Sequence, residues 1–382
     1  MRRAGLAVLA VLAGTPTMNA ALAEQADLKP LAFSDLAGWA EDDHAAAFRA
    51  FRRSCGPILD KQAELRPAQI AGAGLREVCQ AASALTVRSK AEARRFFETH
   101  FRPHEIVLKT GRGFLTGYYE PEFRGSRTRT ETFTVPLLDR PDDLVTIPQG
   151  ESLPGIEPGL QAARRTATGY EPYPDRAAIE GGALGQRAKP VVWLKEPGEA
   201  FILHVQGSAR IRLTDGSVMR VAYAGRNGRP YTSIGRVLVE RGIMDLESMT
   251  LEKLMGWLKD NPAEARELMH RNRSYIFFRE ARELAPDEGP VGGAGHPLVP
   301  GRSLAVDRNL WPYGLPFWLE GRLPVTLEKA DPLNRLMIAQ DTGSAILGPA
   351  RGDFFVGSGP EAGTRAGLMR HTTRFVVLLP AR

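Results

Sequence analysis

The 382-residue chain has few of the residues and motifs on which the commonest enzyme chemistries depend. It holds only two cysteines, and its seven histidines are scattered without HExxH or CxxC spacing. A Gly-x-Ser-x-Gly elbow, a Walker loop and a dinucleotide fingerprint are all missing. These absences argue against metal, serine-nucleophile and nucleotide chemistry, so we expect neither a metal nor a cofactor.

Long apolar runs are also scarce, and the one that stands out is at the N-terminus. Arg2 and Arg3 precede an apolar run over residues 4–13, and Ala-Leu-Ala follows at 21–23. This order predicts a secretory signal, residues 1–23, cleaved after Ala23. No other stretch approaches the roughly 20 residues that span a bilayer. No cysteine near the cleavage point could carry a lipid, so we expect an exported, soluble, periplasmic protein and leave outer-membrane association open.

The two cysteines, Cys55 and Cys79, are expected to form one disulfide, because an even count in an exported chain is typical of a disulfide framework. Closing a loop of this size contributes roughly 3 kcal/mol in the chain-entropy model. The alternative is a pair of free buried thiols. Neither cysteine has the neighbouring histidine or glycine-rich turn that a catalytic thiol would need.

The net charge of the chain gives a weak indication of its binding partner. Lys and Arg total 50 and Asp and Glu total 44, which gives a net charge of +6. A mild positive excess suits an anionic polymer. No ribonucleoprotein, helix-turn-helix or zinc-finger pattern accompanies it, so we expect no nucleic acid.

The residue pattern changes from helical to strand-like along the chain. Apolar spacing predicts helices over residues 35–54 and 92–101, so the first hundred residues form a helical lead. From residue 107 short alternating runs predict strands, and Asp215-Gly216 marks a hairpin between two of them. The length favours two domains. The fold class is therefore mainly β with a helical N-terminal lead, and its predicted strands cover residues 113–121, 191–194, 200–205, 209–213, 217–221, 275–278, 304–307, 317–320, 335–340, 354–357 and 374–379.

One stretch, residues 333–363, has the pattern of a functional site. It places Asp341 and Asp353 at the ends of short apolar strands and surrounds them with glycines, which let a ligand approach the main chain. The alternative is that both are turn or cap aspartates.

The tetrapeptide Asp-Thr-Gly-Ser at 341–344 also matches an aspartic protease superficially. That chemistry needs two copies, so that two carboxylates share a proton, and the chain has one. Glycan chemistry also uses paired carboxylates. A single acid suffices when the substrate supplies its own hydroxyl as the nucleophile.

These residues carry a family resemblance. The segment QDTGSAILGPARGDFFVGSGPEAGTRAG, residues 340–367, resembles the closing block of the 3D domain of the membrane-bound lytic transglycosylase A family, a domain named for three aspartates. The third aspartate would be Asp307. Further matching blocks occur in the same order and cover residues 116–121, 205–208, 223–235 and 272–278.

The resemblance implies a double-psi β-barrel domain into which a second β-barrel domain is inserted. The first domain would comprise residues 24–118 and 273–382, including the helical lead and the 3D region. The insert would comprise residues 119–272. A groove for peptidoglycan would lie between the two domains.

The implied reaction cleaves the β-1,4 bond from N-acetylmuramic acid to N-acetylglucosamine and leaves a 1,6-anhydromuramic end. By motif, the single acid and base is Asp353, and Asp341 would support it. The neighbouring Phe354 and Phe355 are expected to lower the local dielectric and favour the protonated acid. Asp307 is either a substrate-binding or a structural residue.

Further groove residues follow from the same motifs, with a packing role as the alternative for each: Thr116, Tyr118, Tyr119, Gln206 and Ser208. The expected partner is the peptidoglycan strand, bound by a monomer, with weak association to wall-remodelling proteins. The competing functional reading is a non-catalytic, expansin-like protein that binds glycan and loosens the wall.

Overall fold

The computed structural model describes residues 20–381 except 61–65, 67, 70–72, 149, 246–248, 286–287 and 327. Most of the predicted signal segment therefore lies outside the described residues. The described part begins with helix α1 (Ala20–Gln25) and strand β1 (Ala26–Pro30). None of its helices has the length and apolar character needed to cross a membrane.

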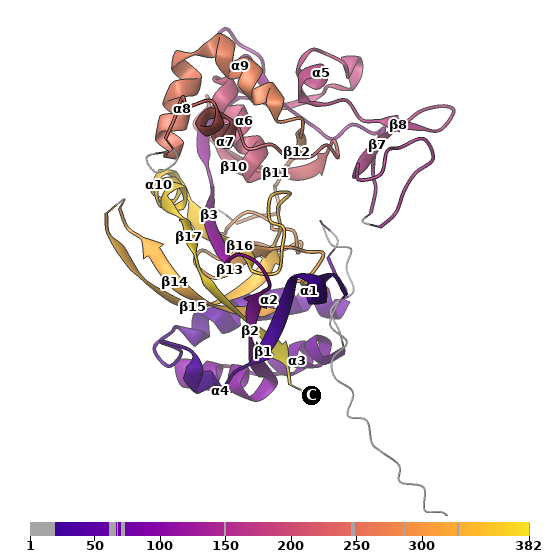
Figure 1. Cartoon of the computed structure of the whole chain (residues 1–382). Coiled ribbons are helices and arrows are strands. Elements are labelled where there is room, and N and C mark those ends of the chain that lie inside the picture. The colour runs from indigo at the N-terminus through magenta and orange to yellow at the C-terminus, as the bar shows by residue number, and fades with distance from the viewer. Residues whose placement is uncertain are drawn as a thin grey trace, which may run out of the picture.

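A nine-stranded sheet is built from both ends of the chain (Figure 1). Its paired order runs from β1 at one edge to β17 at the other, so the described strands form no closed ring. After β1 that order continues with β2 (Phe101–Leu108), β18 (Arg374–Pro380), β14 (Pro316–Pro324), β15 (Ala330–Asp341), β13 (Ser303–Val306), β16 (Arg351–Ser358), β3 (Phe114–Glu120) and β17 (Arg370–Thr372).

Three helices of the N-terminal lead pack against this sheet: α2 (His44–Asp60), α3 (Ala73–Ala84) and α4 (Lys90–His100). The helical lead is thus confirmed, although β1 also lies in it and pairs with β2. Phe51 and Phe97 are fully buried in the shared core. Burying each such side chain contributes about 1.5–3 kcal/mol.

Helices α2 and α3 are also joined covalently. A disulfide links Cys55 to Cys79, with their Cα atoms 5.0 Å apart. It closes the segment that connects the two helices, so this cross-link restrains the loop at both of its ends.

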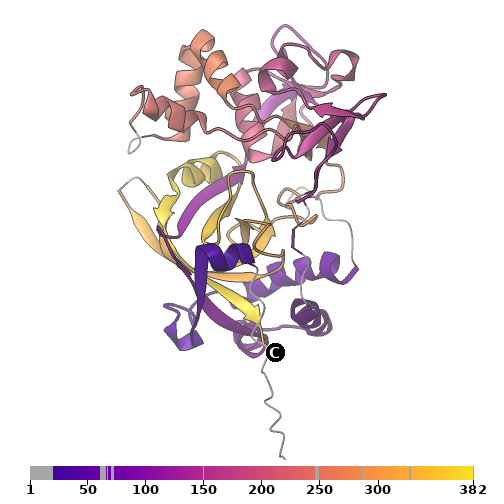
Figure 2. The ribbon, with the colours of Figure 1, turned by 45° about the vertical axis from the view of Figure 1, so that its right-hand side comes forward.

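Strand β3 leads out of the first sheet into a second body, seen above the first in Figures 1 and 2. Six strands form its main sheet and three form a small one. The six are β12 (Ile276–Glu280), β11 (Val218–Arg226), β10 (Ser208–Leu213), β4 (Glu122–Ser126), β9 (Pro190–Leu194) and β5 (Val135–Leu138), and the three are β6 (Leu144–Thr146), β7 (Ala162–Arg165) and β8 (Tyr170–Pro172).

Helices complete both bodies. In the second body they are α5 (Arg176–Glu180), α6 (Pro197–Gln206), α7 (Ile234–Glu240), α8 (Leu251–Asp260) and α9 (Pro262–Arg271), while α10 (Pro360–Leu368) packs on β3 and β16. Short 3₁₀ turns lie at Phe33–Asp35 and Gly185–Arg187. Because β12 pairs with β11, the six-stranded sheet extends beyond residue 272.

The strand predicted over residues 200–205 is wrong, because this segment is helix α6. Its apolar run is too short for periodicity to separate a buried strand from a buried helix. Pro197 occupies the first turn, and Gly207 ends the helix at φ 82°, a left-handed conformation that suits glycine. These end signals decide in favour of the helix.

A buried carboxylate ties the two bodies together at the end of β3. Glu120 is 1% exposed and accepts hydrogen bonds from Arg210 Nε at 2.9 Å and Arg220 Nη2 at 2.8 Å. It also accepts one from Ser358 Oγ at 2.7 Å. Because β3 and β16 belong to one sheet and β10 and β11 to the other, this cluster fixes the junction at which the chain passes between them.

Candidate active site

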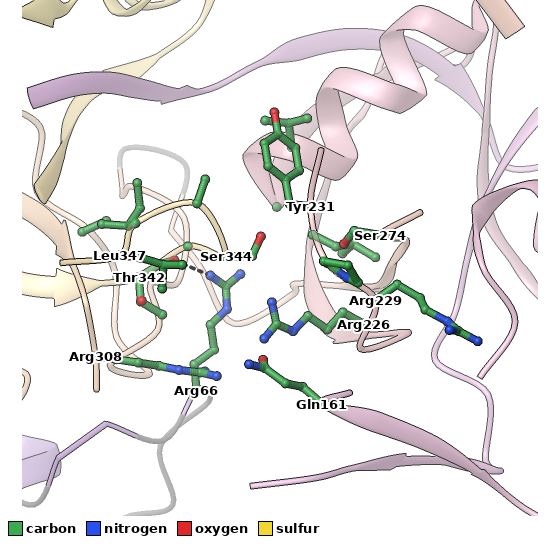
Figure 3. A pocket seen from close by; sticks show the side chains of 18 of the residues that line it. Arg66, Gln161, Arg226, Arg229, Tyr231, Ser274, Arg308, Thr342, Ser344 and Leu347 are labelled. Atoms are coloured by element: carbon green, nitrogen blue, oxygen red, sulfur yellow. Dashed lines mark hydrogen bonds between the residues drawn. The ribbon is translucent and has the colours of Figure 1, made fainter. Parts of the chain in front are cut away.

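A pocket of about 900 Å³ lies where the two bodies meet. Thr116, Asp341 and Asp353 line it from the nine-stranded sheet, and Tyr223 and Tyr231 line it from the second body. Figure 3 shows side chains from both bodies turned into this space. The fold therefore brings the two aspartates of the 333–363 stretch into one pocket.

Asp353 lies in β16, between β13 and β3. It is in register with Thr116 on the parallel strand β3, and the Thr116 hydroxyl donates a hydrogen bond to Asp353 Oδ1 at 2.7 Å. Arg351 Nη2 donates to the same hydroxyl at 2.8 Å. The threonine hydroxyl has one proton, so the arginine contact directs that proton to Asp353.

Burial raises the pKa of Asp353 to about 6, although the positive charge of Arg351 and the Thr116 hydrogen bond both oppose this. The side chain is only half-buried at the pocket wall, so a ligand can reach it. Within the described part of the chain, no hydrogen bond is made to Asp353 Oδ2. That oxygen is therefore positioned to carry an acidic proton.

The two phenylalanines beside Asp353 lie on opposite faces of the sheet. Phe354 is buried in the main core with the helices, whereas Phe355 packs with Tyr118 and Ile346. Only Phe355 thus contributes to the apolar wall around the acid. The expectation that both phenylalanines lower the dielectric there is corrected by the alternation of side chains along a strand.

Asp341 ends strand β15 and is held by donors from separate segments. Its Oδ2 accepts the Tyr118 hydroxyl at 2.9 Å, and its Oδ1 accepts the Gly293 N–H at 2.7 Å. A side chain at Gly293 would meet the Tyr313 hydroxyl at 2.4 Å, so the close approach requires glycine. Arg66 adds a positive charge 3.7 Å from Oδ1. This carboxylate is fixed in orientation at the pocket wall.

The third aspartate, Asp307, connects two loops. Its carboxylate oxygens accept the backbone N–H groups of Asn309 at 3.0 Å and Gly348 at 2.8 Å. The side chain is 6% exposed, although the residue lines the pocket. These contacts favour the structural alternative for Asp307, because each oxygen already accepts a backbone hydrogen bond that holds a loop.

Only some of the remaining predicted groove residues line the pocket. Thr116, Tyr118 and Gln206 line the pocket, whereas Tyr119 and Ser208 are absent from the lining that the described residues form. Tyr119 packs against Ala362 and Ala366 of α10, and its N–H donates to Gln206 Oε1 at 3.1 Å. Tyr119 therefore helps to position Gln206 from behind.

The sequence analysis missed Arg66, which lies in the loop between α2 and α3. Its guanidinium carbon lies 4.1 Å from the centre of the Tyr223 ring in β11, and its Nη1 donates to the Thr342 carbonyl at 2.6 Å. It thereby contacts both bodies across the pocket. Tyr223 lies in residues 223–235, one of the segments that resemble the family, but no local sequence pattern indicates a role for Arg66. Among the described residues, no group of His, Cys, Asp or Glu could hold a metal ion.

Two family models match the chain. One, the MltA specific insert domain, covers residues 114–279, and the other, the 3D domain, covers residues 302–379. The chain is 33% identical to membrane-bound lytic murein transglycosylase A of Vibrio cholerae and 34% identical to that of Escherichia coli K12, over 70% of its length in both cases. The alignments span 65% and 66% of the length of those two relatives.

Solved structures extend the comparison. The membrane-bound lytic murein transglycosylase of Agrobacterium tumefaciens superposes with a TM-score of 0.83 at 38% identity, covering 93% of this chain and 98% of that one. MltA of Neisseria gonorrhoeae superposes with a TM-score of 0.75 at 33% identity, and the alignment covers 93% of each chain. Escherichia coli MltA with bound chitohexaose superposes with a TM-score of 0.60 at 28% identity, and the alignment covers 93% of this chain and 92% of that one. This chain belongs to the membrane-bound lytic murein transglycosylase A family.

Proposed function

We propose that this protein is a lytic transglycosylase of peptidoglycan. It cleaves the β-1,4 bond between N-acetylmuramic acid and N-acetylglucosamine and leaves a 1,6-anhydromuramic end. The observation that carries the proposal is Asp353, a single carboxyl group with a pKa raised to about 6 in a pocket between two bodies. The names of the relatives support the substrate, and the chitohexaose bound to one of them supports a glycan groove.

In the first step, Asp353 Oδ2 gives its proton to the glycosidic oxygen as the bond to the muramic C1 breaks. The leaving sugar departs with a hydroxyl group, and positive charge develops on C1 and the ring oxygen. A carboxyl whose pKa is raised to about 6 is protonated in a useful fraction of molecules near neutral pH. The Thr116 hydrogen bond to Oδ1 keeps the other oxygen directed at the substrate.

In the second step, the Asp353 carboxylate accepts the proton of the muramic C6 hydroxyl while that oxygen bonds to C1. The acid is thereby regenerated, and no water enters the product. Asp341 supports the reaction by placing negative charge near the developing cation. Its hydrogen bonds from Tyr118 and Gly293 hold it there without a movement during the reaction.

Digestion of murein sacculi tests the proposal. The wild-type protein should release 1,6-anhydromuropeptides, which mass spectrometry distinguishes from hydrolysis products because they are lighter by one water. Asp353→Asn should lower turnover by about 10²–10⁴-fold, the usual contribution of a general acid. The control Asp215→Asn changes an exposed hairpin carboxylate and should leave turnover intact.

Three results would contradict the proposal in different ways. Reducing muropeptides would indicate a hydrolase. Binding to sacculi without any turnover would favour the expansin-like alternative. Full activity in Asp353→Asn would indicate that Asp341, rather than Asp353, is the general acid.

We also propose the finer architecture and location. The nine-stranded sheet would form a double-psi β-barrel domain and the second body an inserted β-barrel domain. The mixture of parallel β13–β15 and antiparallel β13–β16 pairs supports the first of these two domains, in which the sheet stays open between the edge strands β1 and β17. We place the second boundary of the insert after residue 280 rather than at residue 272, and the pairing of β12 with β11 supports this choice. After removal of residues 1–23, the protein would act as a soluble periplasmic monomer, with weak association to wall-remodelling proteins.

A further inference from the structure

Three arginines from distant parts of the chain meet in the pocket. Arg66 comes from the loop between α2 and α3, Arg226 ends strand β11, and Arg308 follows strand β13. Figure 3 shows their side chains directed toward the same part of the pocket, with Gln161 beside them. We call Arg66, Arg226 and Arg308 the arginine cluster.

The arginine cluster is poorly neutralised by the protein itself. In the described part of the chain, Arg226 and Arg308 form no ion pair with a carboxylate, whereas Arg66 forms one with Asp341 at 3.7 Å. Burial and the like charges of Arg308 and Arg66 lower the pKa of Arg226 to about 10. The nearby Arg229 differs, because its guanidinium donates to the Tyr173 carbonyl at 3.0 Å. Gathering unpaired positive charge costs free energy that an incoming anion would recover.

Unpartnered polar atoms at the same place also indicate a ligand. Arg66 Nε and Gln161 Oε1 are buried and make no hydrogen bond among the described residues. Buried polar groups are normally paired, since leaving one unpaired costs about 1–3 kcal/mol. Both residues belong to the pocket lining, so these unpaired atoms lie in the wall of the same space as the arginine cluster.

We propose that the arginine cluster is a subsite for a carboxylate carried by the substituent of the muramic acid residue. This inference rests on the proposed function, because it takes murein as the substrate. A murein strand carries carboxylates either on its lactyl group, when no peptide is attached, or on its acidic stem peptide. Guanidinium groups bind carboxylates through paired, directional hydrogen bonds. A strand of N-acetylglucosamine alone has no such group, so the arginine cluster would distinguish murein from chitin.

Binding measurements on the full mature chain with Asp353→Asn test the subsite, because this variant is expected to leave the ligand intact. Three murein tetrasaccharides serve as probes: one with a free acidic stem peptide, one with its peptide carboxylates amidated, and one without peptide. Isothermal titration gives the Kd of each at low salt.

We expect a ligand with the recognised carboxylate to bind at least about tenfold tighter than the amidated one, as one charged hydrogen bond can supply. Preference for the free stem peptide identifies the peptide as the source. Preference for the peptide-free strand identifies the lactyl group. In Arg226→Gln/Arg308→Gln, that preference should fall below about twofold.

The matched control is Arg212→Gln/Arg236→Gln, which removes the same charge from side chains that are 54% and 80% exposed. It should retain the preference. Equal affinity for all three probes, or a preference that survives in Arg226→Gln/Arg308→Gln, would overturn the proposal. Failure of the transglycosylase proposal is seen separately, as missing anhydro products from the wild-type protein, so the two failures are distinguishable.

Discussion

Asp341 and Asp353 lie in the two strands that flank β13, and both are in register with the same residue, Ala305. Neighbouring strands are about 4.8 Å apart, which places the two Cα atoms about 10 Å apart. Each carboxylate also has its own hydroxyl donor, Tyr118 for Asp341 and Thr116 for Asp353. In aspartic proteases, by contrast, the two carboxylates lie against each other and share one proton. The arrangement instead suits one acid with a separate supporting charge.

The pH dependence of activity should respond to the Thr116 hydroxyl. Its hydrogen bond stabilises the charged form of Asp353 and so lowers the pKa of that carboxyl. From the pKa of about 6, we expect the falling limb of kcat/KM near pH 6 in the wild type. In Thr116→Val we expect this limb to move upward by about one pH unit. Rates on soluble murein strands from pH 4 to 9 measure this. Thr364→Val, at an exposed site on α10, serves as control, and an unmoved limb in Thr116→Val would refute the role.

The stability of the protein should also depend on the protonation of Asp353. Its pKa is about 6 in the folded state and 3.8 as a reference. The folded state therefore binds the proton more tightly, and stability is lost as the pH rises from about 4 through 6. Asp353→Asn should be more stable than wild type by about 2–3 kcal/mol above pH 7. The difference should vanish below pH 4 in urea unfolding, and a difference independent of pH would exclude this cause.

The supporting role proposed for Asp341 can be tested through its hydrogen-bond donor. Tyr118→Phe leaves Asp341 Oδ2 without the hydroxyl that lies 2.9 Å away. We expect kcat/KM on murein strands to fall by about tenfold to a hundredfold, mainly through kcat, since the carboxylate loses its fixed orientation. Tyr170→Phe on β8, outside the pocket lining, is the matched control. Equal rates for the wild type and Tyr118→Phe would show that this bond plays no part.

The junction between the two bodies should depend on Glu120. Its carboxylate is 1% exposed and bonded to both Arg210 and Arg220, so Glu120→Gln leaves two partly buried positive charges without their partner. We expect a loss of about 3–5 kcal/mol in the free energy of unfolding, measured with urea. Glu122→Gln, which removes an exposed pair with Arg212, should cost less than about 1 kcal/mol. Similar losses in the two variants would mean that the buried cluster does not hold the junction.

Local patterns in the sequence were sufficient where one segment carries the whole signal. The helix predicted over residues 92–101 corresponds to α4, and residues 335–340 lie within β15. The helix predicted over residues 35–54 corresponds to α2, which begins only at His44 and continues to Asp60. The apolar run at residues 200–205 was misassigned, because the signals that decide it lie outside the run, at Pro197 and Gly207. Strand alternation, applied to Phe354 and Phe355, would have shown that only one of them can share a face with the acid.

The sequence by itself determined the candidate side chains for the chemistry: Asp341 and Asp353 among glycines, within motifs that identify the family. Only the tertiary structure decided what surrounds them. Thr116 and Asp353 are 237 residues apart, and the contact of Arg66 with Tyr223 joins the two bodies. Periodicity reports which face of a segment is buried but not which distant segment covers it. The pKa of Asp353 and the positive charge of the arginine cluster depend on those distant neighbours, so they emerge only when the chain is folded.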